Sequence, residues 1–181
     1  MRVVAVVLAA GASIRLGRPK QLLEYRGEPL IRHAALVAAA AGCDETFVIV
    51  PPDSFAAELD GLGVTRIENP DWKRGVSSSI RAAVRAADGA RVLFTLCDQP
   101  LVTAEHLRDM IRVDAPIVAT EYRGVTGVPA AFAPRFAMEL SALDGDRGAR
   151  SIIEAHAEHV VPIRLEEAGV DIDTFDDYLK L

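Results

Sequence analysis

The chain has 181 residues, 50% of them hydrophobic and 25% charged, which is typical of one globular domain and excludes a disordered segment. Its 20 basic and 26 acidic side chains give a formal net charge of −6, which disfavours a protein that neutralises nucleic-acid phosphates. Cys43 and Cys97 form no C-x-x-C pair, and the apolar run at residues 2–10 is too short to span a bilayer. We therefore expect a cytoplasmic protein with neither a nucleic-acid nor a membrane partner.

Short β-branched runs alternate with longer alanine-rich runs up to residue 122. The continuous apolar run Val3 to Leu8 predicts a strand that is buried on both faces. Pro29 in a first turn and Gly42 as a stop delimit a helix over residues 29–41. The further predicted strands are 46–50, 64–67, 91–97 and 116–122, and the further helices are 53–59, 77–87 and 103–113.

Beyond residue 122 the alternation becomes irregular. The predicted elements are strands at 128–132 and 160–165 and helices at 134–143, 149–158 and 174–179. Alternation of strands and helices implies a mainly parallel sheet covered on both faces, in an α/β fold. Ligands of such sheets bind beyond the carboxyl ends of the strands, which directs attention to the loops after Leu8, Val50, Ile67 and Cys97.

The first of these loops, residues 9–20, is suited to phosphate binding. Gly11 follows the buried strand, where a glycine lets backbone N–H groups approach a phosphate, and Arg15 and Lys20 add positive charge. Gly11 and Gly17 are six residues apart, which excludes the G-x-G-x-x-G fingerprint, and the position of Lys20 excludes a P-loop. A plain surface connection is the alternative interpretation.

The pattern Leu8-Ala9-Ala10-Gly11-x-Ser13-x-Arg15-x-Gly17-x-x-Lys20 resembles the signature loop of the molybdenum-cofactor nucleotidyltransferases, and most closely their cytidylyltransferase branch. Later segments match in order, so that the resemblance covers nearly the whole chain: 69–79, 97–100, 127–129, 145–150 and 171–174. It implies the Rossmann-like nucleotide-diphospho-sugar transferase fold, a three-layer α/β/α sandwich with a mainly parallel, partly mixed sheet. Residues 1–181 would then form a single domain, with 1–122 as the nucleotide-binding half and 123–181 as the half that binds the acceptor and completes the sheet.

One residue of this loop bears on the nucleotide base. The guanylyl branch resembles Leu-Ala-Gly-Gly at this turn, whereas this sequence has Ala10 before Gly11. A methyl group there takes up space that a larger purine needs, and such a difference contributes about 1–3 kcal/mol of discrimination. The resemblance and this methyl group favour CTP over GTP.

Asp98 directly follows the strand predicted at 91–97, where a carboxylate can hold Mg²⁺ against nucleotide phosphates or simply cap the turn before Pro100. The resemblance favours the magnesium site and implies a second acidic ligand from the pair Asp171 and Asp173. We select Asp173, although it is also placed to be the N-cap of the last predicted helix.

The remaining candidates come from three further segments. By resemblance, Gly75, Ser78 and Ser79 lie beside the nucleotide, although Ser77 alone is a plausible helix N-cap. Glycines and charges after residue 122 suit a bulky anionic acceptor, or alternatively hairpin turns and a surface ion pair; these candidates are Gly127, Pro129, Asp146 and Arg150. His156 and His159 lack the H-E-x-x-H pattern, so the sequence predicts no zinc site there.

The resemblance implies that CMP is transferred from CTP to the terminal phosphate of molybdopterin with release of pyrophosphate. Arg15, Lys20 and Asp98 would be catalytic, and the loop Leu8, Ala9, Ala10, Gly11 and Ser13 would bind the nucleotide. A molybdoenzyme that receives the product is an implied partner. The alternatives are a guanylyl or sugar-phosphate nucleotidyltransferase and a non-catalytic molybdopterin-binding chaperone, whereas the missing glycine fingerprint argues against a nicotinamide-dependent reductase.

Overall fold

The computed structural model describes residues 1–13 and 16–181 of the chain, and the described residues form a seven-stranded sheet in the order β5-β4-β1-β6-β8-β7-β9. Its strands are β1 (Val3–Leu8), β4 (Glu45–Val50), β5 (Thr65–Glu68), β6 (Arg91–Leu96), β7 (Ile117–Tyr122), β8 (Val125–Phe132) and β9 (Val160–Arg164). Only β8 runs antiparallel to its neighbours among these described strands. The predicted mainly parallel, partly mixed sheet is confirmed.

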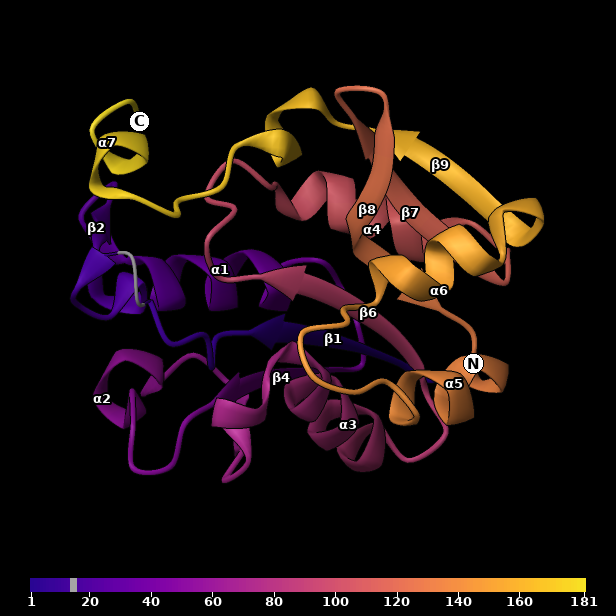
Figure 1. Cartoon of the computed structure of the whole chain (residues 1–181), viewed down its shortest axis with the longest axis horizontal. Helices are drawn as coiled ribbons and strands as arrows, with labels where there is room; N and C mark the ends of the chain where they lie inside the picture. The colour runs from indigo at the N-terminus through magenta and orange to yellow at the C-terminus, as the bar shows by residue number, and fades with distance from the viewer. Residues whose placement is uncertain (14–15) are drawn as a thin grey trace.

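Helices cover both faces of this sheet, which completes the expected three layers (Figure 1). The main helices are α1 (Leu30–Ala39), α3 (Val76–Ala87), α4 (Ala104–Arg112), α5 (Ala137–Ser141) and α6 (Arg150–Ala155). Side chains of β1 alternate between the faces: Val4 and Val6 join the cluster under α3, α5 and α6, and Ala5 and Val7 join the cluster under α1. Because β1 is buried on both faces, its sequence is apolar throughout rather than alternating.

Two predicted boundaries near α1 and α2 are wrong. The helix predicted at 53–59 is only α2 (Ala56–Leu59), because Asp53 and Phe55 both have left-handed backbone conformations, with φ of 54° and 58°. A small hairpin of β2 (Glu24–Tyr25) and β3 (Glu28–Pro29) precedes α1 and has no sequence prediction. Pro29 therefore precedes the first turn of α1 instead of lying in it.

The helices after β8 are shorter than the sequence pattern suggested. The segment predicted as helix 134–143 divides into a 3₁₀ turn, η4 (Pro134–Phe136), and α5. The helix predicted at 149–158 ends at Ala155 and is followed by a second 3₁₀ turn, η5 (Ala157–His159). The last helix is α7 (Phe175–Tyr178). Further 3₁₀ turns are η2 (Lys20–Leu22), η3 (Trp72–Arg74) and η6 (Glu166–Gly169).

The segment after β9 returns the chain to the edge of the sheet where the parallel strands end. Figure 1 shows this segment crossing to α7, which lies beside β2, while the N-terminus lies at the opposite end. The Tyr178 hydroxyl donates a hydrogen bond to the Glu24 carbonyl oxygen at 2.8 Å, which joins the two chain segments. Within the described ranges, no helix has the length and apolar character needed to cross a bilayer.

Candidate active site

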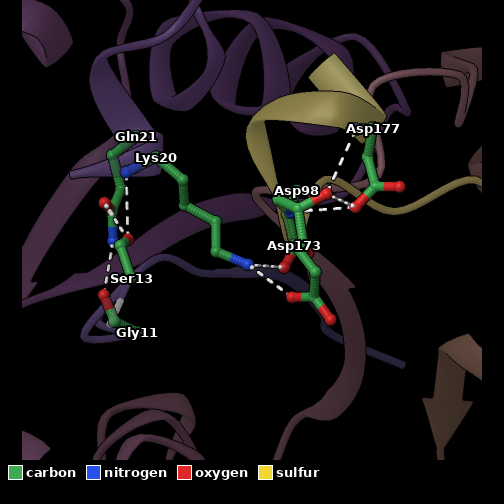
Figure 2. A network of polar contacts seen from close by, with 8 residues as sticks. Gly11, Ser13, Lys20, Gln21, Asp98, Asp173 and Asp177 are labelled. Carbon is green, nitrogen blue, oxygen red and sulfur yellow. Dashed lines mark hydrogen bonds and ion pairs between the residues drawn. The ribbon is translucent and has the colours of Figure 1, made fainter. Parts of the chain in front are cut away.

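The loop after β1 is held in shape by a buried glutamine that sequence analysis missed. Gln21, only 3% exposed, donates from Nε2 to the carbonyl oxygens of Ala9 at 2.7 Å and Gly11 at 2.9 Å. The Ser13 hydroxyl accepts from the Lys20 backbone N–H at 2.9 Å and donates to Gln21 Oε1, as Figure 2 shows. This network joins the carbonyl oxygens of Ala9 and Gly11 and the Ser13 hydroxyl to the segment that begins at Lys20. Arg15, a predicted catalytic residue, lies outside the described residues.

A cavity of about 460 Å³ opens beside this loop, at the carboxyl ends of β1 and β6. Five of the predicted nucleotide-binding residues line it. They are Leu8, Ala10, Gly11, Gly75 and Ser79, together with Asp98 and Asp146. Trp72 and Lys73 also line this cavity; neither is among the predicted site residues, although an aromatic and a cation beside a loop of this kind suit a nucleotide. Segments that lie far apart in the sequence thus enclose one volume.

The start of α3 is organised by Asn69, a second residue that the sequence analysis passed over. Asn69 is 2% exposed, and its Nδ2 donates to Ser78 Oγ at 2.8 Å and Ser79 Oγ at 3.1 Å. Ser78 in turn donates to the Gly75 carbonyl oxygen, so Ser78 lies within the helix start while Ser79 reaches the cavity. The N-cap position is Gly75, which corrects the alternative that Ser77 caps this helix.

Three charged side chains converge at the strand ends. The Lys20 ammonium lies 2.6 Å from Asp98 Oδ2 and 3.2 Å from Asp173 Oδ1 (Figure 2). Lys20 comes from η2, Asp98 from the turn after β6 and Asp173 from the segment before α7. The N-cap of α7 is Thr174, whose hydroxyl accepts from the Asp177 N–H in a capping box, so the alternative that Asp173 is this cap is wrong.

Burial and ion pairing have opposite effects on the pKa of Lys20. Burial lowers the pKa of Lys20, but the Asp98 carboxylate and the hydrogen bonds to Asp98 and Asp173 outweigh it, so the pKa of Lys20 lies above its ordinary value. Burial, and then the negative charge of Asp173, raises the pKa of the nearby Asp171 carboxyl. The Lys20 ammonium thus stays charged between two carboxylates.

The donor set around Lys20 fits a hard divalent cation. Asp98 and Asp173 already direct one carboxylate oxygen each toward a common positive charge. Carboxylate oxygens are the ligands that Mg²⁺ and Mn²⁺ prefer, and Mg²⁺ is usually held by one or two carboxylates plus substrate phosphates. The residues present are therefore suited to a magnesium or manganese ion bound together with a nucleotide.

The predicted acceptor residues do not form one cluster. Asp146 lines the nucleotide cavity, whereas Arg150 lines a second cavity of about 310 Å³ beside α6, β8 and β9 and pairs with Glu154 at 2.8 Å. Pro129 follows a cis peptide bond, and its carbonyl oxygen accepts from the Thr120 hydroxyl at 2.8 Å. A Cβ atom on Gly127 would lie 2.7 Å from the Tyr122 hydroxyl oxygen, so a larger residue there would require the tyrosine ring to shift.

Tyr122, which was not singled out from the sequence, lies beside Gly127. Burial raises the pKa of its phenol, which also lies in the electric field of Arg150 and Asp171.

Gln99, the residue after Asp98, donates from Nε2 to the carbonyl oxygens of Ala168 at 2.8 Å and Val128 at 3.2 Å. The turn after β6 is thereby joined to the start of the predicted acceptor half.

Comparisons with known proteins agree with this architecture. A family model described as MobA-like NTP transferase domain matches residues 5–160. The chain is 30% identical to nicotine blue oxidoreductase of Paenarthrobacter nicotinovorans, over 99% of this chain and 96% of that protein. It is 25% identical to molybdenum cofactor cytidylyltransferase of Escherichia coli K12, over 96% and 92%. The crystal structure of Rv0371C of Mycobacterium tuberculosis H37Rv in complex with manganese is similar, with a TM-score of 0.79, 31% identity, and coverage of 100% of this chain and 98% of that one.

Proposed function

Since the chain belongs to the MobA-like NTP transferase family and is a nucleotidyltransferase, we propose that it transfers CMP from CTP to the terminal phosphate of molybdopterin and releases pyrophosphate. One observation carries the proposal. Lys20, Asp98 and Asp173 converge at the strand ends, where Asp98 also borders a cavity lined by the first loop and the start of α3. Such an arrangement holds a triphosphate and its metal ion side by side.

The proposed step is a displacement at the α-phosphorus of CTP. An oxygen of the acceptor phosphate forms a bond to the α-phosphorus while the bond from that phosphorus to the bridging oxygen of pyrophosphate breaks. A phosphate oxygen is already ionised at neutral pH, so no side-chain base has to remove a proton. Catalysis then consists of positioning and of stabilising charge on the phosphates.

Each proposed role follows from a side chain or backbone segment of this chain. Lys20 has three N–H donors; within the described part of the chain two carboxylates use two of them, which leaves one for a phosphate oxygen. We assign Arg15 to the same phosphates. The loop that Gln21 holds, Leu8 to Ser13, would bind the nucleotide with Gly75, Ser78 and Ser79, where Ser78 acts by fixing the helix start.

Asp98 and Asp173 would hold Mg²⁺. When bound, this ion neutralises charge on the nucleotide phosphates. The similar Rv0371C protein of Mycobacterium tuberculosis forms a complex with manganese, and a site built from two carboxylates accepts either ion.

We propose that residues 123–181 bind the acceptor at this edge of the sheet. It would lie next to the nucleotide, which residues 1–122 would bind. Gly127, Pro129, Asp146 and Arg150 are the proposed contacts. The Tyr122 phenol supports this placement, because it packs on Gly127 and lies in the field of Arg150. A molybdoenzyme that receives the dinucleotide product is the proposed partner.

The test is a matrix of four nucleoside triphosphates with Mg²⁺ and molybdopterin, read as pyrophosphate release and as dinucleotide product by mass. CTP should give the fastest release of pyrophosphate, and this release should require molybdopterin. If GTP were the only nucleotide to give product, or if a sugar phosphate replaced molybdopterin as the acceptor, one of the other transferase reactions would replace this proposal. Tight molybdopterin binding without any pyrophosphate would indicate a carrier protein instead.

A second candidate function rests on the full-length similarity to nicotine blue oxidoreductase at 30% identity. The proposed reaction there is reduction of nicotine blue, the compound in that relative's name. The assay mixes the protein with nicotine blue and each of a series of electron donors, and follows the absorbance of the dye. Reduction that depends on the protein, with no pyrophosphate from any nucleotide in the matrix, would favour this second function.

A further inference from the structure

A turn that bears two histidines connects α6 to β9. In this turn, η5, the His159 backbone N–H donates to the His156 carbonyl oxygen at 2.8 Å. Side chains three residues apart in a 3₁₀ turn point in the same direction. The two imidazole rings accordingly stack, with planes 20° apart and centroids separated by 6.2 Å. Ligand atoms of His156, Glu158 and His159 all lie within 4.8 Å of one another.

His156 is fixed by two residues from the η4–α5 segment. Its ring meets the edge of Phe136, with centroids 5.1 Å apart and planes at 69°. Its Nε2 lies 2.7 Å from Glu139 Oε2. An ionised carboxylate can only accept a hydrogen bond, so Nε2 carries the proton when the imidazole is neutral and the lone pair is on Nδ1. A carboxylate that fixes a histidine tautomer in this way is a common feature of metal sites.

Although the sequence pattern predicts no zinc site here, we propose that His156, His159 and Glu158 form a binding site for a divalent transition-metal ion of the Zn²⁺ class, and that Glu139 orients His156. Imidazole nitrogens favour Zn²⁺, Ni²⁺ and Cu²⁺ over Mg²⁺. The three side chains supply two nitrogens and one oxygen, which leaves a fourth tetrahedral position for water. This site differs in chemistry from the all-oxygen pair of Asp98 and Asp173.

Closing around an ion requires these side chains to rotate, because the two imidazole rings stack with planes 20° apart. With Zn–N bonds of about 2.0–2.1 Å, the ligand atoms of a tetrahedral site lie about 3.3 Å apart. Glu158 and His159 have side chains that are 66% and 45% exposed, so both can rotate toward His156. Because β9 runs parallel to β7, this turn lies at the edge where the parallel strands begin, opposite to Asp98. Figure 1 places it far from α7.

Isothermal titration of metal-free protein with ZnCl₂, in a background of excess Mg²⁺, tests the site directly. Cys43→Ser in every sample removes the half-buried thiol as a competing ligand. We expect one Zn²⁺ per chain, lost in His156→Ala and in His159→Gln. Glu139→Gln should weaken binding by about 10- to 100-fold, because it removes the carboxylate that orients His156. Glu154→Gln, an exposed carboxylate on α6, is the matched control and should bind normally.

A second readout keeps the inference testable if His156→Ala does not fold. Co²⁺ in a tetrahedral site gives visible absorption bands that solvated Co²⁺ lacks, and His159→Gln changes only an exposed side chain. We expect these bands with the parent protein and their loss in His159→Gln. Absence of Zn²⁺ binding by the parent protein, or binding that His159→Gln leaves unchanged, would overturn the proposal.

Discussion

The backbone N–H of Ile172 donates a hydrogen bond of 3.0 Å to the carbonyl oxygen of Asp98. Ile172 is fully buried among the side chains under α1, so this bond attaches the C-terminal segment to the end of β6. The acidic residues on either side of Ile172 are thereby held next to Asp98. The first predictions test what that proximity does.

Lys20→Ala and Asp98→Ala should each lower turnover by at least about a hundredfold, since each removes charge stabilisation of the transferring phosphates. The measurement is the rate of pyrophosphate release at saturating CTP, with circular dichroism to verify folding. Lys180→Ala and Asp109→Ala, both exposed, are the controls and should keep the parent rate. Rates within severalfold of the parent protein in either site variant would remove that residue from the proposed machinery.

Asp173→Asn should raise the Mg²⁺ concentration needed for half-maximal rate, because an amide coordinates the ion without the negative charge. The stability of Asp173→Asn should equal that of the parent protein, since Thr174 is the cap of α7. The matched variant Thr174→Ala should lose about 1 kcal/mol of stability and keep the magnesium titration of the parent protein. The same titration curve for Asp173→Asn and the parent protein would exclude Asp173 as a ligand.

Ala10→Gly should relax the preference for CTP over GTP by about tenfold, because one methyl group contributes about 1–3 kcal/mol of discrimination. Ala10 is only 5% exposed and lines the cavity, so its methyl group borders the space that is open to a nucleotide. Competition between the two nucleotides at equal concentration gives the ratio directly. An unchanged ratio would mean that base recognition lies elsewhere in the cavity.

Gly75→Ala should destabilise the protein by more than about 2 kcal/mol, through a steric clash and backbone strain. Gly75 has φ of 94°, and an added Cβ would lie 2.3 Å from the Gly145 carbonyl oxygen. Gly89 follows the same helix with φ of 75° and open space around it, so Gly89→Ala isolates the strain of the positive φ. Urea unfolding should show a much larger loss for Gly75→Ala than for Gly89→Ala; equal losses would contradict the clash.

The free energy of unfolding should fall as the pH is lowered from 7 to 5, partly because of His106. This imidazole is buried with Nε2 2.8 Å from Thr120 Oγ1, and burial lowers its pKa. An unfolded histidine titrates near pH 6.5, so below that pH the unfolded chain binds a proton that the folded chain does not.

His106→Gln should therefore show a smaller pH dependence in urea unfolding at pH 5 and pH 7. Part of the dependence should remain, since burial also lowers the pKa of His33. His159→Gln, which changes an exposed side chain, is the control. If the free energy of unfolding of His106→Gln changed between pH 5 and pH 7 as much as that of the parent protein, His106 would not be a source of the pH dependence.

Local residue patterns were enough to predict the strands and the position of the loop after β1. The apolar run of β1, the run before Asp98 and the Gly11-to-Lys20 segment each carry their signal within a few neighbouring residues. Propensity and hydrophobic periodicity act over that range, which is why the strands of the sheet could be predicted. Element ends were less accurate because local backbone conformations such as those of Asp53 and Phe55 decide them.

Tertiary structure alone decided which distant side chains meet. Gln21 shapes the first loop, Asn69 holds two serines of α3, and Glu139 reaches His156 only because α5 packs near the turn after α6. Asp173 reaches Lys20, the partner of Asp98, because the adjacent Ile172 is buried under α1, whereas the local sequence around Asp173 equally suited a helix cap. Such contacts depend on strand order and on the paths of connecting segments, and no short window of sequence contains both partners.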